Sequence, residues 1–331
     1  MGNADQSAKD PLVDKELTIV NKVLWIFCVV LGLAVLVVVL LPRITSEETC
    51  SYEEAVNRLA KGQFVDVDGK PVHYVRKGAG KPVILIHGYL HNVQGWRENI
   101  DALADKFEVY ALDLWGFGYS ARLKKPQYSF RLFAKQVAGF MDALNIKSAS
   151  LVGHSMGGGV TVCTAAQHPG RVDKIVLAAP GVIPHKLSLS MRIYRLPFVG
   201  EFLGAIPRNA SLNRTLRTCC FYDQDKMPSD FVKTFTEPMC IEGSRTAALY
   251  ILRNVLRYPY ASREADMLAS AGKPILLAHG RQDKLVPLTD SETLHDKWKG
   301  SELVVFEKCG HNLQQEYPEK FNKLVVDFLT R

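Results

Sequence analysis

The sequence predicts an α/β fold in which a mostly parallel, eight-stranded sheet carries helices on both faces. Short apolar runs of strand length recur along the chain, and stretches with helical periodicity lie between them. A serine flanked by glycines stands where one of these runs gives way to a helix. With 331 residues, 47% of them hydrophobic and 23% charged, the chain suits one large folded domain and is not typical of a disordered protein.

The N-terminal part differs from the rest. A polar tail, residues 1–22, precedes Val23–Leu41, an uncharged run of 19 apolar residues. At about 1.5 Å per residue this run covers most of a hydrocarbon layer about 30 Å thick, so we expect a transmembrane helix. A cleavable signal peptide is the alternative, but the apolar region of signal peptides is only about 7–15 residues long, which is shorter than this run. Lys9, Lys15 and Lys22 precede the run, which favours a single-pass membrane protein whose main domain lies on the non-cytoplasmic side.

The next elements follow in order. Residues 42–63 are expected to form a linker with a short helix that Ser51 caps. Two strands flank the turn Asp68-Gly69 and predict an antiparallel hairpin. The eight expected strands are residues 64–67, 71–76, 83–86, 109–112, 150–152, 175–178, 275–278 and 303–306.

A long interval separates the sixth expected strand from the seventh. Residues 181–266 are rich in aromatic side chains, Pro and Arg, and they lack the rhythm of strands. We therefore expect a helical insertion that covers the sheet as a cap. The core domain is then formed by residues 64–180 and 267–331.

The sharpest local motif is Gly153-His-Ser155-Met-Gly157, a G-x-S-x-G pentapeptide between an expected strand and an expected helix. A serine at such a junction sits on a strained turn, and its neighbours must be small to avoid the adjacent strand and helix. The turn also places the hydroxyl near the N-terminus of a helix, where free N–H groups favour negative charge. The pattern indicates a nucleophilic Ser155.

Over residues 64–331 the sequence resembles the α/β-hydrolase family. The chain order of that family is nucleophile, acid, histidine, and its pattern falls on Asp283 in His279-Gly-Arg-Gln-Asp-Lys-Leu-Val-Pro and on His311 in Cys309-Gly-His-Asn. The resemblance implies a catalytic triad of Ser155, Asp283 and His311. His311 would take the serine proton as general base, and Asp283 would fix the imidazole.

A tetrahedral oxyanion needs two converging donors. The resemblance assigns them to the backbone N–H groups of Met156, just after the nucleophile, and of Tyr89 in His87-Gly-Tyr89. The segment from Asp113 to Ser120 also matches the family and is expected to be architectural. His91, Asn92 and Trp96 are candidate substrate-binding residues near the oxyanion turn, and an ordinary loop followed by a packed helix is the alternative for them.

Several classes of function are disfavoured. The net charge of +7 is mild, and the sequence has no nucleic-acid motif, no metal-ligand cluster and no dinucleotide fingerprint. We therefore expect no cofactor, no metal and no nucleic-acid partner. The expected partners are a small-molecule or lipid ester substrate and a bilayer bound through residues 23–41.

The expected function is a membrane-anchored serine hydrolase that cleaves carboxylic esters through an acyl-enzyme on Ser155. The predicted span favours lipid-like esters such as monoacylglycerols or lysolipids. One alternative is a carbon–carbon bond hydrolase of the ring-fission-product type, although the oxyanion turn of those relatives typically reads HGxGPG and here reads His87-Gly-Tyr-Leu-His-Asn92. An acyltransferase with the same triad is another alternative. A non-catalytic membrane scaffold is disfavoured because all three triad residues are present.

Overall fold

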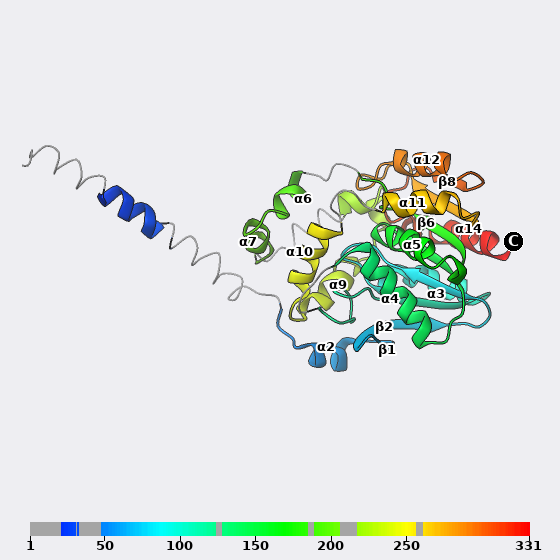
Figure 1. Ribbon diagram of the computed structural model, residues 1–331, viewed down its shortest axis with the longest axis horizontal. Coiled ribbons are helices and arrows are strands. Elements are labelled where there is room, and N and C mark those ends of the chain that lie inside the picture. Colours follow the sequence, from blue (N-terminus) through cyan, green and yellow to red (C-terminus); the bar gives the residue numbers. More distant parts are fainter. Residues whose placement is uncertain are drawn as a thin grey trace, which may run out of the picture.

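The computed structural model describes residues 21–30, 32, 48–123, 128–184, 189–205, 217–255 and 261–331. At its centre lies an eight-stranded sheet with the strand order β1-β2-β4-β3-β5-β6-β7-β8 (Figure 1). The strands are β1 (Gln63–Val67), β2 (Lys70–Lys77), β3 (Pro82–Ile86), β4 (Glu108–Leu112), β5 (Ala149–His154), β6 (Val172–Ala178), β7 (Ile275–Gly280) and β8 (Glu302–Phe306).

The sheet is mostly parallel, as the sequence predicts. Strand β2 is antiparallel to both of its neighbours, β1 and β4, and the five remaining pairings are parallel. Each expected strand lies within an observed one. The hairpin between β1 and β2 turns at Asp68 and Gly69, whose φ values of 53° and 72° suit the turn residues expected there.

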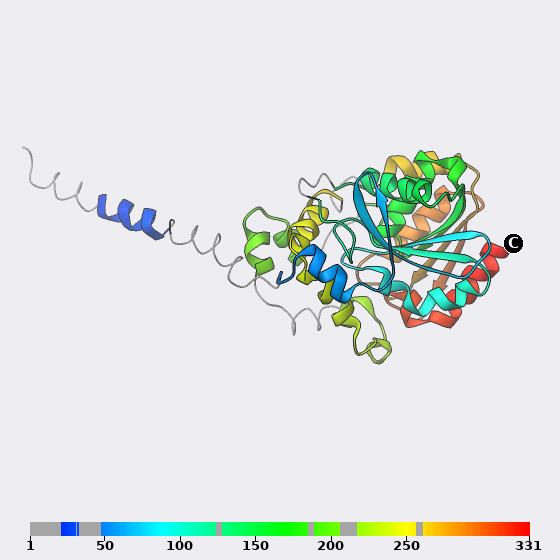
Figure 2. The ribbon, with the colours of Figure 1, turned by 90° about the horizontal axis from the view of Figure 1, so that it is seen from below.

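Helices cover both faces of the sheet (Figure 2). Along β3, Val83 and Leu85 enter one apolar cluster, whereas Ile84 and Ile86 enter the other, because successive side chains of a strand point to opposite faces. Helices α3 (Arg97–Ala104) and α14 (Pro318–Thr330) pack in the first cluster. The second cluster contains residues of α4 (Phe130–Ala143), α5 (Met156–Gln167), α11 (Ser262–Ala269) and α12 (Leu288–Lys297). The fold is therefore a three-layer α/β sandwich.

The described residues between β6 and β7 form the expected helical insertion. Its elements are α6 (Leu189–Tyr194), α7 (Val199–Ala205), η3 (Gln224–Lys226), α9 (Phe231–Thr236), η4 (Glu237–Cys240) and α10 (Ser244–Asn254). The expected boundary at residue 266 falls inside α11. That helix packs on α5 with Ala265 and Leu268 in the main cluster, and Trp298 donates its indole N–H to the Ala265 carbonyl over 2.9 Å. In its packing, α11 therefore belongs with the core.

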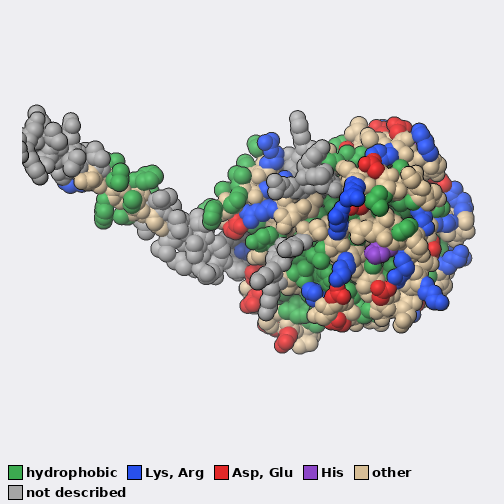
Figure 3. All heavy atoms as spheres, viewed as in Figure 1, with side chains coloured by type: hydrophobic (Ala, Val, Ile, Leu, Met, Phe, Trp, Pro, Cys, Tyr) green, Lys and Arg blue, Asp and Glu red, His purple; other side chains and the backbone are tan. Residues whose placement is uncertain are grey.

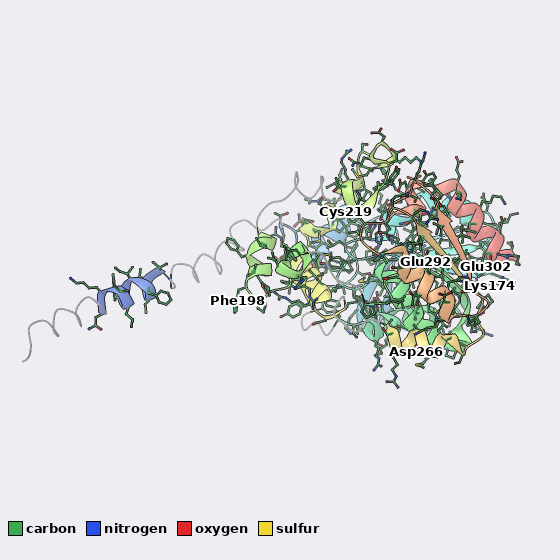
Figure 4. The ribbon with its side chains drawn as sticks, turned by 90° about the horizontal axis from the view of Figure 1, so that it is seen from above. Lys174, Phe198, Cys219, Asp266, Glu292 and Glu302 are labelled. Atoms are coloured by element: carbon green, nitrogen blue, oxygen red, sulfur yellow. The ribbon has the colours of Figure 1, made fainter. Side chains whose placement is uncertain are left out.

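The outer part of the cap carries exposed apolar side chains. Phe198 is 75% exposed and lies at the outer edge of the cap (Figure 4), and Leu189 is 68% exposed. Figure 3 shows hydrophobic side chains at the surface of this end of the domain. On its inner side, α10 packs onto the core through Ala247 and Ile251, which contact the position of Gly116. The cap thus has one face on the core domain and one face in solvent.

The N-terminal prediction needs correction. Of the expected span Val23–Leu41, residues 23–30 and 32 are described, and they are helical and exposed; the rest of the span and residues 1–20 and 42–47 lie outside the described residues. Within the described part of the chain, no helix is both long and apolar enough to cross a membrane. The expected single-pass placement, with the main domain on the non-cytoplasmic side, is therefore wrong for the described chain.

The short helix of the linker is present. It is α2 (Tyr52–Leu59), and the Ser51 side chain accepts a hydrogen bond from the Glu54 N–H over 3.2 Å, as expected of a capping residue. Just before it, Cys50 forms an isolated parallel bridge with Ile241 of the cap. The chain therefore enters the domain alongside the cap.

Candidate active site

Ser155 occupies the sharp turn between β5 and α5. Its φ of 54° and ψ of −120° lie outside the regions that residues other than glycine usually adopt, a strain that costs about 1–3 kcal/mol. The turn is held by backbone hydrogen bonds: the Ser155 N–H donates to Ala178 over 2.9 Å, and the Ser155 carbonyl accepts from Gly158 and Gly181. The strained conformation is therefore fixed by its surroundings.

The two glycines of the motif are required by close approach. A Cβ at Gly153 would lie 2.4 Å from the Gly157 carbonyl oxygen, and a Cβ at Gly157 would lie 2.2 Å from the Ile86 carbonyl oxygen. Both obstacles are backbone atoms, which have little room to move. This supports the sequence argument that only glycine fits beside the serine turn.

The acid and the histidine meet at the carboxyl ends of β7 and β8. The His311 Nδ1 lies 2.7 Å from the Asp283 Oδ2, within hydrogen-bonding distance. The other carboxylate oxygen accepts the backbone N–H groups of Leu285 and Val286 over 2.7 and 3.0 Å. Burial would raise the pKa of Asp283, but the charge of His311 and the hydrogen bonds from His279 and His311 outweigh burial and lower it. Asp283 is therefore a carboxylate that holds the imidazole.

Ser155 lies in the same neighbourhood as this pair. The ring of His154, the residue before the serine, is 4.8 Å from the His311 ring between centroids, and its Nε2 is 3.1 Å from the His311 carbonyl oxygen. Among the described residues, the Ser155 hydroxyl makes no hydrogen bond to the His311 ring. Such bonds are often long before substrate binds, so the geometry is compatible with a resting nucleophile and base.

The expected oxyanion donors lie on either side of the serine. Met156 is the first residue of α5, so its N–H belongs to the orphan donors of a helix start. On the other side, a Cβ at Gly88, next to Tyr89, would lie 3.1 Å from the Ser155 Cβ. The hydroxyl of Tyr89 donates to the Ala248 carbonyl over 3.0 Å, which ties the oxyanion turn to the cap.

The turn itself is fixed by His87. The His87 Nε2 accepts the Leu114 N–H over 2.9 Å, which requires this nitrogen to carry no proton, and Nδ1 donates to the Gly88 carbonyl over 2.7 Å. Burial lowers the pKa of His87, in agreement with a neutral ring. His87 is thus a structural support of the oxyanion turn.

The three candidate substrate-binding residues differ in their contacts. Asn92 accepts the Gln94 N–H and donates to the Thr234 carbonyl of the cap, and Trp96 is almost fully buried in the apolar core. Both are packed against neighbouring segments, and their substrate-binding role stays a prediction. His91 lies at the junction of the turn and the cap, 4.2 Å from the ring of Phe235 between centroids.

Asp113 organises the loop behind the oxyanion turn, which agrees with its expected architectural role. This fully buried carboxylate accepts the N–H groups of Val93 and Tyr119 and lies 2.7 Å from the His73 Nδ1. The His73 Nε2 lies 2.9 Å from the Lys61 carbonyl oxygen, so both ring nitrogens face acceptors. Burial disfavours the charge of His73, but the charge and hydrogen bond of Asp113 outweigh burial and raise the pKa of His73. The two side chains form a buried ion pair.

Glu316 was not identified from the sequence. Its side chain is buried and accepts the Gly310 N–H over 2.7 Å, next to His311, and the N–H groups of Tyr222 and Asp223 over 3.2 and 2.8 Å. One carboxylate therefore joins the histidine loop to the returning segment of the cap. The only signal in the sequence was an acidic residue within a buried turn, which is too common to be informative.

The comparisons with known proteins agree with this geometry. A family model described as the alpha/beta hydrolase fold matches residues 81–318. The chain belongs to the α/β hydrolase family. This α/β hydrolase is 32% identical over 264 residues to a 2-hydroxymuconate semialdehyde hydrolase of a Pseudomonas species, a match that covers 76% of this chain and 88% of the relative. It is 30% identical to a 2-hydroxy-6-oxo-6-phenylhexa-2,4-dienoate hydrolase of Comamonas testosteroni, covering 84% and 97%.

A solved structure is also similar. The meta-cleavage product hydrolase of Pseudomonas fluorescens superposes with a TM-score of 0.69 at 28% identity, covering 81% of this chain and 97% of that protein. The family and the names of these relatives support hydrolase activity.

Proposed function

We propose that this α/β hydrolase is a serine hydrolase in which Ser155 is the nucleophile, His311 the general base and Asp283 the acid that orients the base. The observation that carries the proposal is the 2.7 Å contact between His311 and Asp283, at the edge of the sheet where Ser155 occupies its strained turn. The three side chains come from the ends of three different strands. Their order along the chain is that of the family.

In the proposed reaction, His311 takes the proton of the Ser155 hydroxyl as the oxygen attacks a carbonyl carbon. The N–H groups of Met156 and Tyr89 stabilise the tetrahedral oxyanion, a contribution of about 10² to 10³ in rate for one such donor. His311 then returns the proton to the leaving group. Water activated by the same imidazole releases the acid from Ser155.

For the substrate, we propose a 2-hydroxy-6-oxo-2,4-dienoate that is cleaved at the carbon–carbon bond next to its 6-oxo group. The names of the relatives support this class, and the match extends over most of the length of each. The dienol first shifts the proton of its 2-hydroxyl group to C5, which gives the 2,6-diketo form. When the bond from C5 to C6 then breaks, its electron pair leaves with C5 as a dienolate, and the proton from His311 converts this dienolate to the 2-hydroxydienoate. The products are a carboxylic acid and a 2-hydroxydienoate, and one water is consumed.

The expected lipid ester is no longer the favoured substrate. That expectation depended on the predicted membrane span, which the described chain does not contain. The oxyanion turn, His87-Gly-Tyr89, still departs from the typical pattern of carbon–carbon hydrolases. Direct assay of both substrate classes is therefore the appropriate test.

The experiment uses purified protein with 2-hydroxy-6-oxohepta-2,4-dienoate, its phenyl ketone counterpart and p-nitrophenyl butyrate. We expect loss of the dienoate chromophore with release of acetate or benzoate, and no turnover by Ser155→Ala. Turnover of the ester alone would contradict the carbon–carbon assignment while leaving the serine mechanism. Transfer of the acyl group to an added alcohol in preference to water would favour the acyltransferase alternative.

A further inference from the structure

Asp283 contacts a second histidine. The Nε2 of His279, on β7, lies 3.3 Å from the Asp283 Oδ2, the same oxygen that the His311 Nδ1 approaches within 2.7 Å. The His279 Nε2 is also 3.0 Å from the Val286 carbonyl oxygen, and its Nδ1 is 2.7 Å from the Ser291 Oγ. His279, Asp283 and Ser291 are fully buried. The proposed acid therefore lies between two imidazoles.

The acceptors around His279 determine where its proton lies. A backbone carbonyl and an ionised carboxylate only accept hydrogen bonds, so Nε2 carries a hydrogen, with the Val286 carbonyl as its hydrogen-bond partner and the Asp283 Oδ2 in contact at 3.3 Å. In the neutral ring Nδ1 then has no hydrogen and accepts the Ser291 hydroxyl. The result is a chain of donors that runs from Ser291 through His279 to Asp283, which His311 approaches from the other side.

We propose that His279 is a positioning residue of the catalytic pair, and that Ser291 fixes the tautomer in which His279 donates to Asp283. The proposal rests on the proposed Ser155 mechanism. The amides of Leu285 and Val286 hold Oδ1, and His279 is the second donor to Oδ2. Without His279, His311 would be the one remaining partner of this oxygen among the described residues, and the carboxylate would be free to turn away from the base.

The N–H of His279 also lies beside the carboxylate that the His311 ring contacts. It offsets part of the negative charge on Asp283, so its removal strengthens the attraction of this carboxylate for a positive charge next to it. The other titratable groups near the pair include His154 of β5, His91 of the oxyanion turn, Cys220 of the cap and Cys309 of the histidine loop. The carboxylate of Glu316 is also close, since it accepts the Gly310 N–H beside His311. Burial lowers the pKa of His154 to about 3 and lowers that of His91, and it raises the pKa of both thiols. Burial disfavours the charged form of the two imidazoles and of the two thiols.

The test measures the rate constant with which a fluorophosphonate labels Ser155 as a function of pH. The proteins are the full-length wild type, His279→Leu, His279→Gln and Ser291→Ala. In His279→Leu we expect the acid limb to shift upward by about 0.5–1 pH unit and the plateau rate to fall roughly tenfold. The amide nitrogen of Gln reaches the place of Nε2, so in His279→Gln both the acid limb and the plateau rate should return most of the way to the wild-type values. Ser291→Ala removes the group that fixes the tautomer of His279, so it should shift the acid limb upward by less than His279→Leu does.

The proposal would be overturned if the acid limb of His279→Leu lay at the wild-type pH. It would also be overturned if the acid limb and plateau rate of His279→Gln matched those of His279→Leu. A residue that merely fills space predicts neither a shift of the acid limb nor its rescue by Gln. If His279→Leu does not fold, Ser291→Ala takes its place, and a wild-type acid limb in that variant would overturn the proposal. A wild-type protein that takes no label at Ser155 would instead refute the serine mechanism and the role of His279 with it.

Discussion

Replacement of Asp113 by Asn tests how the hydrolase supports its oxyanion turn. The carboxylate accepts two backbone N–H groups over 2.7 and 2.8 Å and pairs with His73 over 2.7 Å in a fully buried site. Asn keeps one acceptor oxygen, but its NH₂ group replaces the other carboxylate oxygen. This group is a hydrogen-bond donor and would face other donors. Two charge-assisted hydrogen bonds are lost, each about 1.5–3 kcal/mol. Removal of one partner of a buried ion pair typically costs about 3–5 kcal/mol, so we expect the free energy of unfolding to fall by an amount within that range.

This loss should depend on pH. The pKa of His73 is raised on folding, so its contribution to stability is complete below the unfolded pKa of about 6.5 and is lost as pH rises through the folded pKa. Burial would raise the pKa of Asp113, but the charge and hydrogen bond of His73 lower it, so its contribution is present above about 3.9 and is lost as pH falls through the folded value. The difference between wild type and Asp113→Asn should therefore be largest near pH 5 and smaller near pH 9.

The assay is urea unfolding followed by tryptophan fluorescence, since Trp96, Trp115 and Trp298 are buried. Asp101→Asn is the matched control because its ion pair with Lys77 is exposed, and such pairs contribute about 0–1 kcal/mol. An Asp113→Asn protein within 1 kcal/mol of wild type at pH 5, or a difference that grows toward pH 9, would refute the ion-pair reasoning.

Three further substitutions test the site itself. Glu316→Gln should destabilise the protein by about 2–4 kcal/mol and raise the rate of amide hydrogen exchange at Gly310, because Gln offers one acceptor oxygen where the carboxylate holds three N–H groups. An unchanged exchange rate at Gly310 would contradict this role. Gly157→Ala should abolish soluble expression or lower the melting temperature by several degrees, because the Cβ of the alanine would lie 2.2 Å from the Ile86 carbonyl oxygen. A wild-type melting curve would be inconsistent with that contact. Asp283→Asn should leave the fold intact and lower kcat by roughly 10⁴, as measured with the dienoate substrate, whereas a loss below tenfold would exclude Asp283 as the acid.

Local patterns in the sequence predicted most of the architecture. Strands buried on both faces have to be short and apolar, so Val83–Ile86 and Ile275–Ala278 stood out without knowledge of their partners. The serine turn was equally visible, because close backbone approach leaves glycine as the only choice on either side. These features depend on neighbours within a few residues along the chain.

Contacts between distant segments could not be predicted in the same way. Glu316 binds amides of the cap more than 90 residues away, and His279 contacts Asp283 only because the loop after β7 folds back. For Trp96 and Asn92 the sequence left a pocket role and a packing role open, and it could not predict the burial of Trp96 or the contact of Asn92 with the cap. The apolar run at residues 23–41 shows the limit of hydropathy alone, since it predicted a membrane span that the described residues do not contain.

The role of Ser155 is tested most directly by locating the covalent adduct of a fluorophosphonate by peptide mass spectrometry. We expect one adduct in the wild type, on the peptide that contains Ser155, and at least a hundredfold slower labelling in His311→Ala, because a serine hydroxyl without its base is a poor nucleophile. An adduct on a different residue, or labelling of His311→Ala at the wild-type rate, would contradict the proposed serine mechanism.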